Sequence, residues 1–356
     1  MHGLPHRRPF FSKQTAAAAR YIHKLFNERD VTMLHDIIFL ILGLALLIFG
    51  GNLVTDGAVA VAKKMNISGL VIGLTIVAFG SSAPDLAVCL FSTMGGKSQM
   101  ALGDVVGAGI FDMLCAVGLT AIVRPVVVDR NSLKCSLPLL FLAALVIFFF
   151  GDDRLIDGAA LDRIDRSDGL VMLCFFAIFM AFTLQSARVQ APASPAPAAA
   201  PQKPAMTMKP WLAAIYIVAG LGALVLGGQW IVDGASGIAL KAGMSEALVG
   251  LTIVAVGSSL PDAATSVIAA IKGQTGLAMG NLIGSCIFDI LFVIGTCASL
   301  RPLNCGQISF FDYGVLVGAS LLLLLFSTFR RSHTIPRWMG FILVGLYAAY
   351  IVAIAS

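Results

Sequence analysis

Residues 73–85 read GLTIVAFGSSAPD, and residues 250–262 read GLTIVAVGSSLPD. Other landmarks recur at the same spacing of 177 residues, because the Ile-Phe-Asp at 110–112 returns at 287–289. The chain is therefore two copies of one unit. Each copy carries acidic residues inside otherwise apolar runs, where a charge is costly and usually functional.

The composition indicates a multi-pass membrane protein, and we expect it in the lipid bilayer of the inner cell membrane. The chain is 58% hydrophobic and only 12% charged, and its mean hydropathy is +0.92. A soluble domain carries about twice that share of charged residues. The net charge of +5 is spread over loops, so no nucleic-acid partner is indicated. The seven cysteines form no CxxC pair, which favours small buried side chains over a metal or redox motif.

Ten segments are predicted as transmembrane helices, because each is mostly apolar and close to the length of about 20 residues that a span needs. They are residues 34–62, 69–93, 99–122, 136–151, 167–186, 210–240, 247–271, 276–299, 309–328 and 336–354. Five spans per copy is an odd number, so the second copy must enter the bilayer from the opposite side. The sequence thus predicts an all-α membrane protein with ten transmembrane helices in two inverted five-helix repeats.

Four parts follow from this division. They are a basic N-terminal tail (1–33), a first repeat (34–186), a Pro/Ala-rich linker (187–209) and a second repeat (210–356). The linker composition predicts a flexible tether. The sequence leaves open whether translation starts at Met1 or at Met33, and whether residues 15–27 form a short amphipathic helix. The loops on the linker side carry more Lys and Arg, which predicts a cytoplasmic linker and both termini outside.

The first element with chemical potential is GSSAPD at 80–85, with its copy GSSLPD at 257–262. Glycine and proline interrupt the helical hydrogen-bond ladder, and broken backbone at membrane depth is tolerated where it lines a cavity. We therefore expect free carbonyls at Ala78 and Ala255, followed within one turn by hydroxyls and a carboxylate. All are hard oxygen ligands, which suit calcium, sodium or a proton.

The second element is GDVVGAGIFD at 103–112, with its copy GNLIGSCIFD at 280–289. Ser285 and Asp289 are four residues apart and share a helix face, whereas the equivalent of Ser285 in the first copy is Ala108. Asp104 and its counterpart Asn281 leave two interpretations open: capping of a half-helix, or a place near the ion path.

These two motif pairs resemble the alpha repeats of the cation/calcium antiporter superfamily, which includes the sodium/calcium exchangers. The resemblance covers about 34–186 and 210–355 and implies one central cation site. It implies ion ligands at these positions: Asp85, Asp112, Asp262, Asp289, Ser81, Ser82, Ser258, Ser259 and Ser285. It also implies alternating access by the first and sixth spans sliding against the other eight.

Three departures from that pattern matter. The family's GTSxPE is GSSxPD here in both copies, and aspartate is one methylene shorter than glutamate. Ala108 replaces a serine, which predicts that one of two symmetric sodium sites has lost a ligand. Asp112 adds a carboxylate where many exchangers have asparagine. A divalent ion offsets only two of four negative charges, so we expect one or two of the four aspartates to hold protons when the site is empty.

The function predicted from the sequence is secondary antiport of calcium, or another divalent cation, for sodium or protons. Two alternatives remain open: a cation/proton exchanger for another ion, and a cation channel. An intramembrane aspartyl protease is disfavoured because its GxGD and PAL motifs are missing, and no P-loop for ATP hydrolysis occurs. We expect no enzymatic activity, no cofactor and no obligate protein partner.

Overall fold

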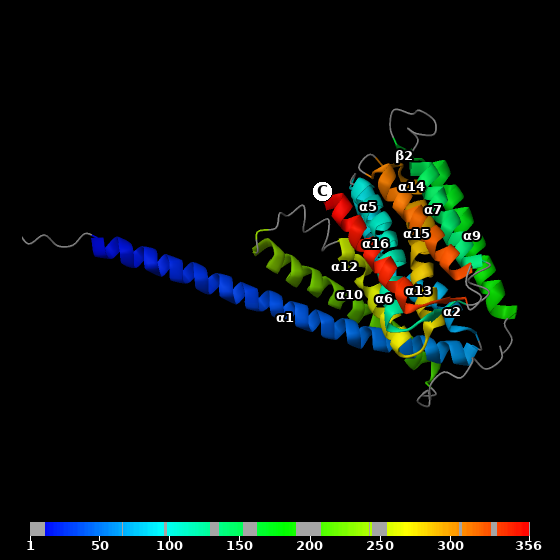
Figure 1. The fold of residues 1–356 in the computed structure, drawn as a ribbon, viewed down its shortest axis with the longest axis horizontal. Helices are drawn as coiled ribbons and strands as arrows, with labels where there is room; N and C mark the ends of the chain where they lie inside the picture. Colours follow the sequence, from blue (N-terminus) through cyan, green and yellow to red (C-terminus); the bar gives the residue numbers. More distant parts are fainter. Residues whose placement is uncertain are drawn as a thin grey trace, which may run out of the picture.

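The computed structural model describes residues 11–65, 67–95, 98–128, 135–151, 162–189, 208–241, 243, 255–305, 308–328 and 333–355, and this part of the chain is nearly all helical (Figure 1). By length and composition, seven helices in it could cross a membrane. They are His35–Met65, Leu102–Val123, Arg166–Gln185, Pro210–Ala235, Thr275–Leu300, Phe310–Thr328 and Arg337–Ile354.

Three further apolar helices are shorter, at Gly69–Ser81, Leu137–Gly151 and Val256–Ile271. Each falls within one of the ten predicted spans. The prediction of a nearly all-helical membrane protein is therefore confirmed, with seven full-length candidate spans in the described residues. Residues 190–207 of the predicted linker, the first ten residues and the start of the seventh predicted span lie outside the described residues.

The elements follow one another in this order: α1 (Phe11–Met65), α2 (Gly69–Ile72), the π-helical η1 (Gly73–Val77), α3 (Ala78–Ser81), α4 (Ala83–Met94), α5 (Ser98–Ile110), π-helical η2 (Phe111–Ala116), α6 (Val117–Val123), β1 (Val126–Val127), α7 (Leu137–Gly151), β2 (Arg163–Ile164), α9 (Arg166–Val189), α10 (Pro210–Lys241), α12 (Ala255–Ile271), α13 (Thr275–Ile287), π-helical η5 (Phe288–Ile294), α14 (Gly295–Leu300), β3 (Leu303–Asn304), α15 (Phe310–Thr328), β4 (Thr334–Ile335) and α16 (Arg337–Ala355).

Helix α1 is longer than the first predicted span. It begins at Phe11 and runs without a break through Met33 to Met65, so the residues of the basic tail from Phe11 onward continue the first span. Figure 1 shows its N-terminal half projecting away from the other helices. The short separate helix considered for residues 15–27 is therefore part of one continuous helix.

Helices α1 and α10 pack closely through glycines. A Cβ atom on Gly43 would lie 2.7 Å from the Gly227 carbonyl oxygen, and one on Gly220 would lie 2.8 Å from the Gly50 carbonyl oxygen. Small residues of this kind let two helix backbones approach each other. The two glycine pairs are counterparts of each other under the repeat, since 43 corresponds to 220 and 227 corresponds to 50.

Two short antiparallel strand pairs also join the copies. Strand β1 pairs with β4, aligning Val126 with Ile335, and β2 pairs with β3, aligning Ile164 with Leu303. Because β1 and β3 are equivalent by the repeat spacing, the two pairs are counterparts. Each pair binds one copy to the other at an end of the helices.

The middle of the structure is formed by α13 and the helices around it. The span Thr275–Leu300 is almost entirely buried inside the protein, whereas only a sixth of Arg337–Ile354 is buried. Helix α13 packs against α2, η1 and α12, and it continues directly into η5. The elements carrying the aspartates of the repeats therefore meet at the centre, away from the lipid-facing helices.

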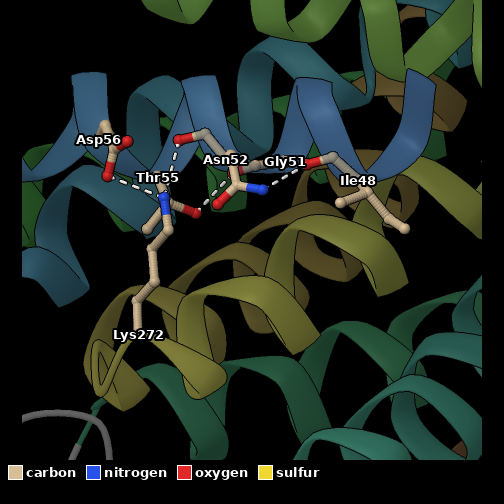
Figure 2. A network of polar contacts seen from close by, with 6 residues as sticks. All are labelled: Ile48, Gly51, Asn52, Thr55, Asp56 and Lys272. Atoms are coloured by element: carbon tan, nitrogen blue, oxygen red, sulfur yellow. Dashed lines mark hydrogen bonds and ion pairs between the residues drawn. The ribbon is translucent and has the colours of Figure 1, made fainter. Parts of the chain in front are cut away.

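One polar contact joins α1 of the first copy to Lys272, which directly follows α12 of the second copy (Figure 2). The Lys272 ammonium donates to the Asn52 carbonyl oxygen at 3.1 Å and to Asp56 Oδ1 at 2.8 Å. The residue equivalent to Lys272 in the first copy is Gly95, which has no side chain to make this contact. The contact therefore breaks the symmetry between the two copies.

Replacing Lys272 with methionine is expected to lower the free energy of unfolding by no more than about 1 kcal/mol, because solvent reaches half of the Asp56 side chain and screens the ion pair. Thermal unfolding in detergent should shift Tm downward by no more than about 4 °C. Asp56→Asn, which leaves the backbone acceptor at Asn52 in place, is the matched control. A drop of 10 °C or more for the methionine variant would contradict this assignment.

Candidate cation-binding site

The GSSAPD segment of the first copy breaks its helix, as predicted. Helix α3 ends at Ser81, Ser82 lies between α3 and α4 with φ −84° and ψ −2°, and Pro84 follows in the first turn of α4. Asp85 also lies in that first turn. An acidic side chain there is favoured by the partial positive charge of a helix N-terminus. The break thus places Asp85 in the first turn of a new helix.

The equivalent segment of the second copy does not break. Helix α12 is continuous from Ala255 to Ile271, with Pro261 inside it. A proline removes one hydrogen bond from the ladder, and a helix can continue past it when the surrounding packing compensates. The prediction of two broken helices is therefore wrong for the second copy.

The other two predicted aspartates lie at the starts of π-helical segments. Asp112 is in the first turn of η2, and Asp289 is in the first turn of η5. π-Helical turns are rare and occur frequently at functional sites. Since both copies widen the helix at the same motif position, the two aspartates are presented in the same way.

The four aspartates come together from four different elements. Asp112, Asp262 and Asp289 are buried, with side chains between 1% and 4% exposed, and Asp85 is partly buried. Asp85 is close enough to interact electrostatically with Asp262 and Asp289, and Asp112 interacts with all three of the others. In the described part of the chain, however, no three Asp, Glu, His or Cys side chains gather tightly enough to enclose a metal ion.

The predicted serines lie beside these carboxyl groups. The Ser81 and Ser285 hydroxyl oxygens are 3.3 Å apart, and both lie next to the Asp262 carboxyl group. Ser82 lies beside Asp289. Ser259 is buried on α12, and the Ser258 hydroxyl points instead to Asp104, a residue outside the predicted ligand set.

Several buried oxygens in this cluster accept no hydrogen bond from any described residue. They are Asp112 Oδ1, Asp289 Oδ1 and Asn281 Oδ1. Within the described residues no Lys, Arg or His side chain is ion-paired with any of the four aspartates. Buried polar atoms without a partner are costly and rare in proteins. A cation is the kind of ligand that would satisfy oxygens of this type.

The expected free carbonyl at Ala78 is not observed. The Ala78 oxygen accepts the Ser82 backbone N–H at 3.0 Å and lies 3.1 Å from the Ser81 hydroxyl. A hydroxyl that bonds back to its own helix commonly satisfies such a carbonyl. In the second copy Ala255 is the first residue of the continuous α12, so the predicted break is not seen there either.

Asn281 is a contributor that the predicted ligand set left out. Its amide nitrogen donates to Asp262 Oδ1 at 2.9 Å and lies 3.2 Å from the Ser266 hydroxyl oxygen. It therefore holds one oxygen of a carboxyl group that the sequence had assigned to ion binding. The sequence did hold a signal for this role, because Asn281 lies four residues before Ser285 in the repeated motif and so shares its helix face.

Comparison with known proteins gives a consistent result. The sequence model of the family described as "Sodium/calcium exchanger protein" matches residues 35–185 and 212–355. The chain is 35% identical to "Putative antiporter CaxA" of Alkalimonas amylolytica, over 89% of this chain and 98% of that protein. It is 28% identical to "Sodium/calcium exchanger MaX1" of Methanosarcina acetivorans, over 90% and 98% of the two chains.

A solved structure is similar as well. The sodium-calcium exchanger NCX_Mj, soaked with 2.5 mM Na+ and 10 mM Sr2+, superposes with a TM-score of 0.74 at 29% identity. The superposition covers 91% of this chain and 99% of that one. Both matched stretches of the family model lie in the two copies of the repeat, and neither includes the linker.

Proposed function

Because the chain belongs to the sodium/calcium exchanger protein family, we propose that it is a secondary antiporter exchanging calcium, or another divalent cation, for sodium or protons. The observation that carries the proposal is the group of buried carboxyl oxygens without hydrogen-bond donors or basic partners in the described residues. Such oxygens need positive charge, and hard oxygen ligands select hard cations.

In this proposal the charge of the site comes from Asp85, Asp112, Asp262 and Asp289. Neutral oxygens come from the hydroxyls of Ser81, Ser82, Ser258, Ser259 and Ser285. Among the described residues no three acidic side chains lie close enough to enclose an ion, which supports a site that tightens around an ion and reopens. A transporter needs this property, because an ion held in a rigid cage would not be released.

We further propose that the two copies form an inverted repeat of ten membrane helices with the site at its centre. The support is the reciprocal pairing of equivalent residues. Gly57 packs against Ala213 and Ile217, and its counterpart Gly234 packs against Asp36 and Leu40, which are the counterparts of those residues. Contacts of this kind arise when two copies are related by a two-fold axis, as in inverted-repeat transporters.

For orientation, the proposal places the linker in the cytoplasm and both termini outside. It rests on the larger number of Lys and Arg residues in the loops on the linker side. The division into tail, repeat, linker and repeat (1–33, 34–186, 187–209 and 210–356) belongs to the same proposal.

The coupling ion is tested by radiolabelled calcium uptake into proteoliposomes with a sodium gradient and a pH gradient imposed separately. We expect uptake under the pH gradient, alone or in addition to uptake under the sodium gradient. The reason is that a divalent ion offsets only two of the four carboxylate charges, so the empty site is expected to hold one or two protons. Uptake should then vary with pH between about 6 and 9, with proton counterflow.

The other outcomes separate the alternatives. Calcium flux that is driven by sodium, is independent of pH over that range and shows no proton counterflow would exclude proton coupling. Flux that runs down the calcium gradient alone, with no stoichiometric counter-ion, would indicate a channel. Failure of calcium uptake under both gradients would exclude calcium as the substrate.

A further inference from the structure

Two cysteines from different copies of the repeat lie side by side in the protein interior. Cys89 belongs to α4 and Cys297 to α14, and their thiol groups lie within hydrogen-bonding reach of each other. Both are free thiols, and they are only 2% and 0% exposed. Because they stand in different halves of the chain, the spacing of cysteines in the sequence does not reveal the pair.

A second contact joins the same two helices one turn further along. Arg301 directly follows α14, and its backbone N–H donates to the Cys297 carbonyl oxygen at 2.9 Å. Thr93 lies four residues after Cys89, near the end of α4. The Arg301 guanidinium donates to the backbone carbonyl oxygens of Thr93 and Met94, at 3.5 Å and 3.2 Å. The thiols and the arginine contact therefore lie along one seam, where α4 and α14 pack together.

The repeat shows that the fold does not require sulfur at this place. The counterparts of the two cysteines are Ser266 and Thr120, on α12 and α6, which also pack together. There each hydroxyl donates to a backbone carbonyl oxygen, Ser266 to Ala278 at 3.3 Å and Thr120 to Ala116 at 2.7 Å. Since hydroxyl side chains fill both positions in one half, packing alone does not explain a pair of thiols in the other.

We propose that Cys89 and Cys297 are a modification site at which oxidation forms a disulfide, and that this bond slows ion exchange. Asp85 precedes Cys89 by four residues on α4, and α14 continues directly from η5, whose first turn holds Asp289. The disulfide thus ties together two helices that bear proposed ion ligands, one from each copy. The effect on exchange rests on the proposed antiport function, whereas the disulfide itself does not.

The position of the pair along the helices favours oxidation. In the proposed orientation α4 and α14 both end on the outer side of the membrane, because each is the last part of an even-numbered span of its chain. The cysteines lie about one helical turn inside those ends. Compartments outside the cytoplasm are oxidising, and disulfides form and persist there.

The reaction balances with a hydroperoxide as the oxidant. One cysteine loses its thiol proton and attacks a peroxide oxygen of hydrogen peroxide, which gives a sulfenic acid and one water. The second thiol attacks the sulfenic sulfur, so that the sulfur–sulfur bond forms and a second water leaves. In total two hydrogens and two electrons pass from the cysteines to the peroxide. Hydrogen peroxide is small and uncharged, which suits buried thiols.

Mass spectrometry tests the bond directly. Purified protein in detergent is treated with hydrogen peroxide, its remaining thiols are alkylated, and it is digested without reduction. We expect one linked peptide that contains Cys89 and Cys297 and disappears on reduction with dithiothreitol. Cys89→Ser removes it and introduces the residue that the other copy has at the same place. Cys174→Ser, at an exposed cysteine on α9, is the matched control and should leave the linked peptide unchanged.

Calcium uptake into proteoliposomes tests the effect on exchange. Peroxide treatment should slow uptake by the wild type at least about fivefold, since conformational steps limit many turnover rates, and dithiothreitol should restore it. Uptake by Cys89→Ser should not respond to peroxide. Absence of the linked peptide, unchanged uptake by the linked protein, or an equal loss in Cys89→Ser would overturn the inference. Reduced wild-type protein without gradient-driven uptake would instead overturn the proposed antiport function.

Discussion

Replacing Asp262 with asparagine is expected to reduce gradient-driven calcium uptake by at least about 100-fold. The carboxyl group of Asp262 is 4% exposed and lies between the Asn281 amide and the hydroxyls of Ser81 and Ser285. Truncating one partner of a buried charge pair typically costs about 3–5 kcal/mol, which corresponds to a factor of 100 or more in an equilibrium constant. In the bound state the cation and the Asp262 carboxylate would form such a pair.

Asparagine is the informative substitution because it keeps the size of the side chain and removes only the charge. Calcium uptake into proteoliposomes is the measurement, with Asp56→Asn as the control at an exposed aspartate. The variant protein should remain folded, since removing a buried charge from a cluster of like charges does not weaken the apo state. Uptake within threefold of wild type would show that Asp262 is not an ion ligand.

Asp85→Asn is expected to reduce uptake as well, by a smaller factor. Asp85 is partly buried, whereas Asp262 is almost fully buried. Water therefore screens the attraction between Asp85 and the ion more strongly than the attraction between Asp262 and the ion. The larger loss of uptake expected for Asp262→Asn follows from burial. The motif is the same in both copies, so the sequence alone would predict equal losses.

The internal repeat allowed much of the fold to be predicted. Seven of the ten segments chosen by hydropathy are full-length candidate spans, because a long apolar run has few alternatives to a membrane helix. The repeat also predicted that aspartates distant in sequence would lie near one another. Asp85 and Asp262 are 177 residues apart, and the structure brings them within electrostatic range.

Three local features could not be predicted from the repeat, and each has its own physical reason. The helix breaks at Ser82 but runs through Pro261, although both segments read GSSxPD. The Ala78 carbonyl accepts bonds instead of being free, because Ser81 turns back onto its own helix. The contact between Ser258 and Asp104 joins α12 to α5, and no pattern within one copy specifies which carboxyl group a serine hydroxyl reaches.

Replacing Gly280 with alanine is expected to lower the free energy of unfolding by at least about 3 kcal/mol. The same replacement on an open helix face would instead leave the stability unchanged or raise it. Helix α13 crosses α2 and η1 at Gly280, where an added Cβ atom would collide with the Leu70 carbonyl oxygen and lie 3.0 Å from the Leu74 nitrogen. The crossing is reciprocal, because a Cβ atom on Gly73 would lie 2.6 Å from the Leu277 oxygen. Overpacking against side chains costs about 1–3 kcal/mol, and backbone atoms give way less readily.

The matched variant is Gly345→Ala on α16, where an added Cβ atom would meet no atom of the described structure within 4 Å. In a helix interior, alanine is more favourable than glycine by about 1 kcal/mol, so this variant should be neutral or slightly more stable. Thermal unfolding of both variants in the same detergent measures the difference. Helix α13 carries Asn281 and Ser285, which lie at the proposed ion site. If Gly280→Ala separates α13 from η1, the variant should therefore also take up calcium more slowly than the wild type. Equal Tm values for the two variants would show that this helix crossing is not tightly packed. Close helix packing would then not explain the glycine at position 280.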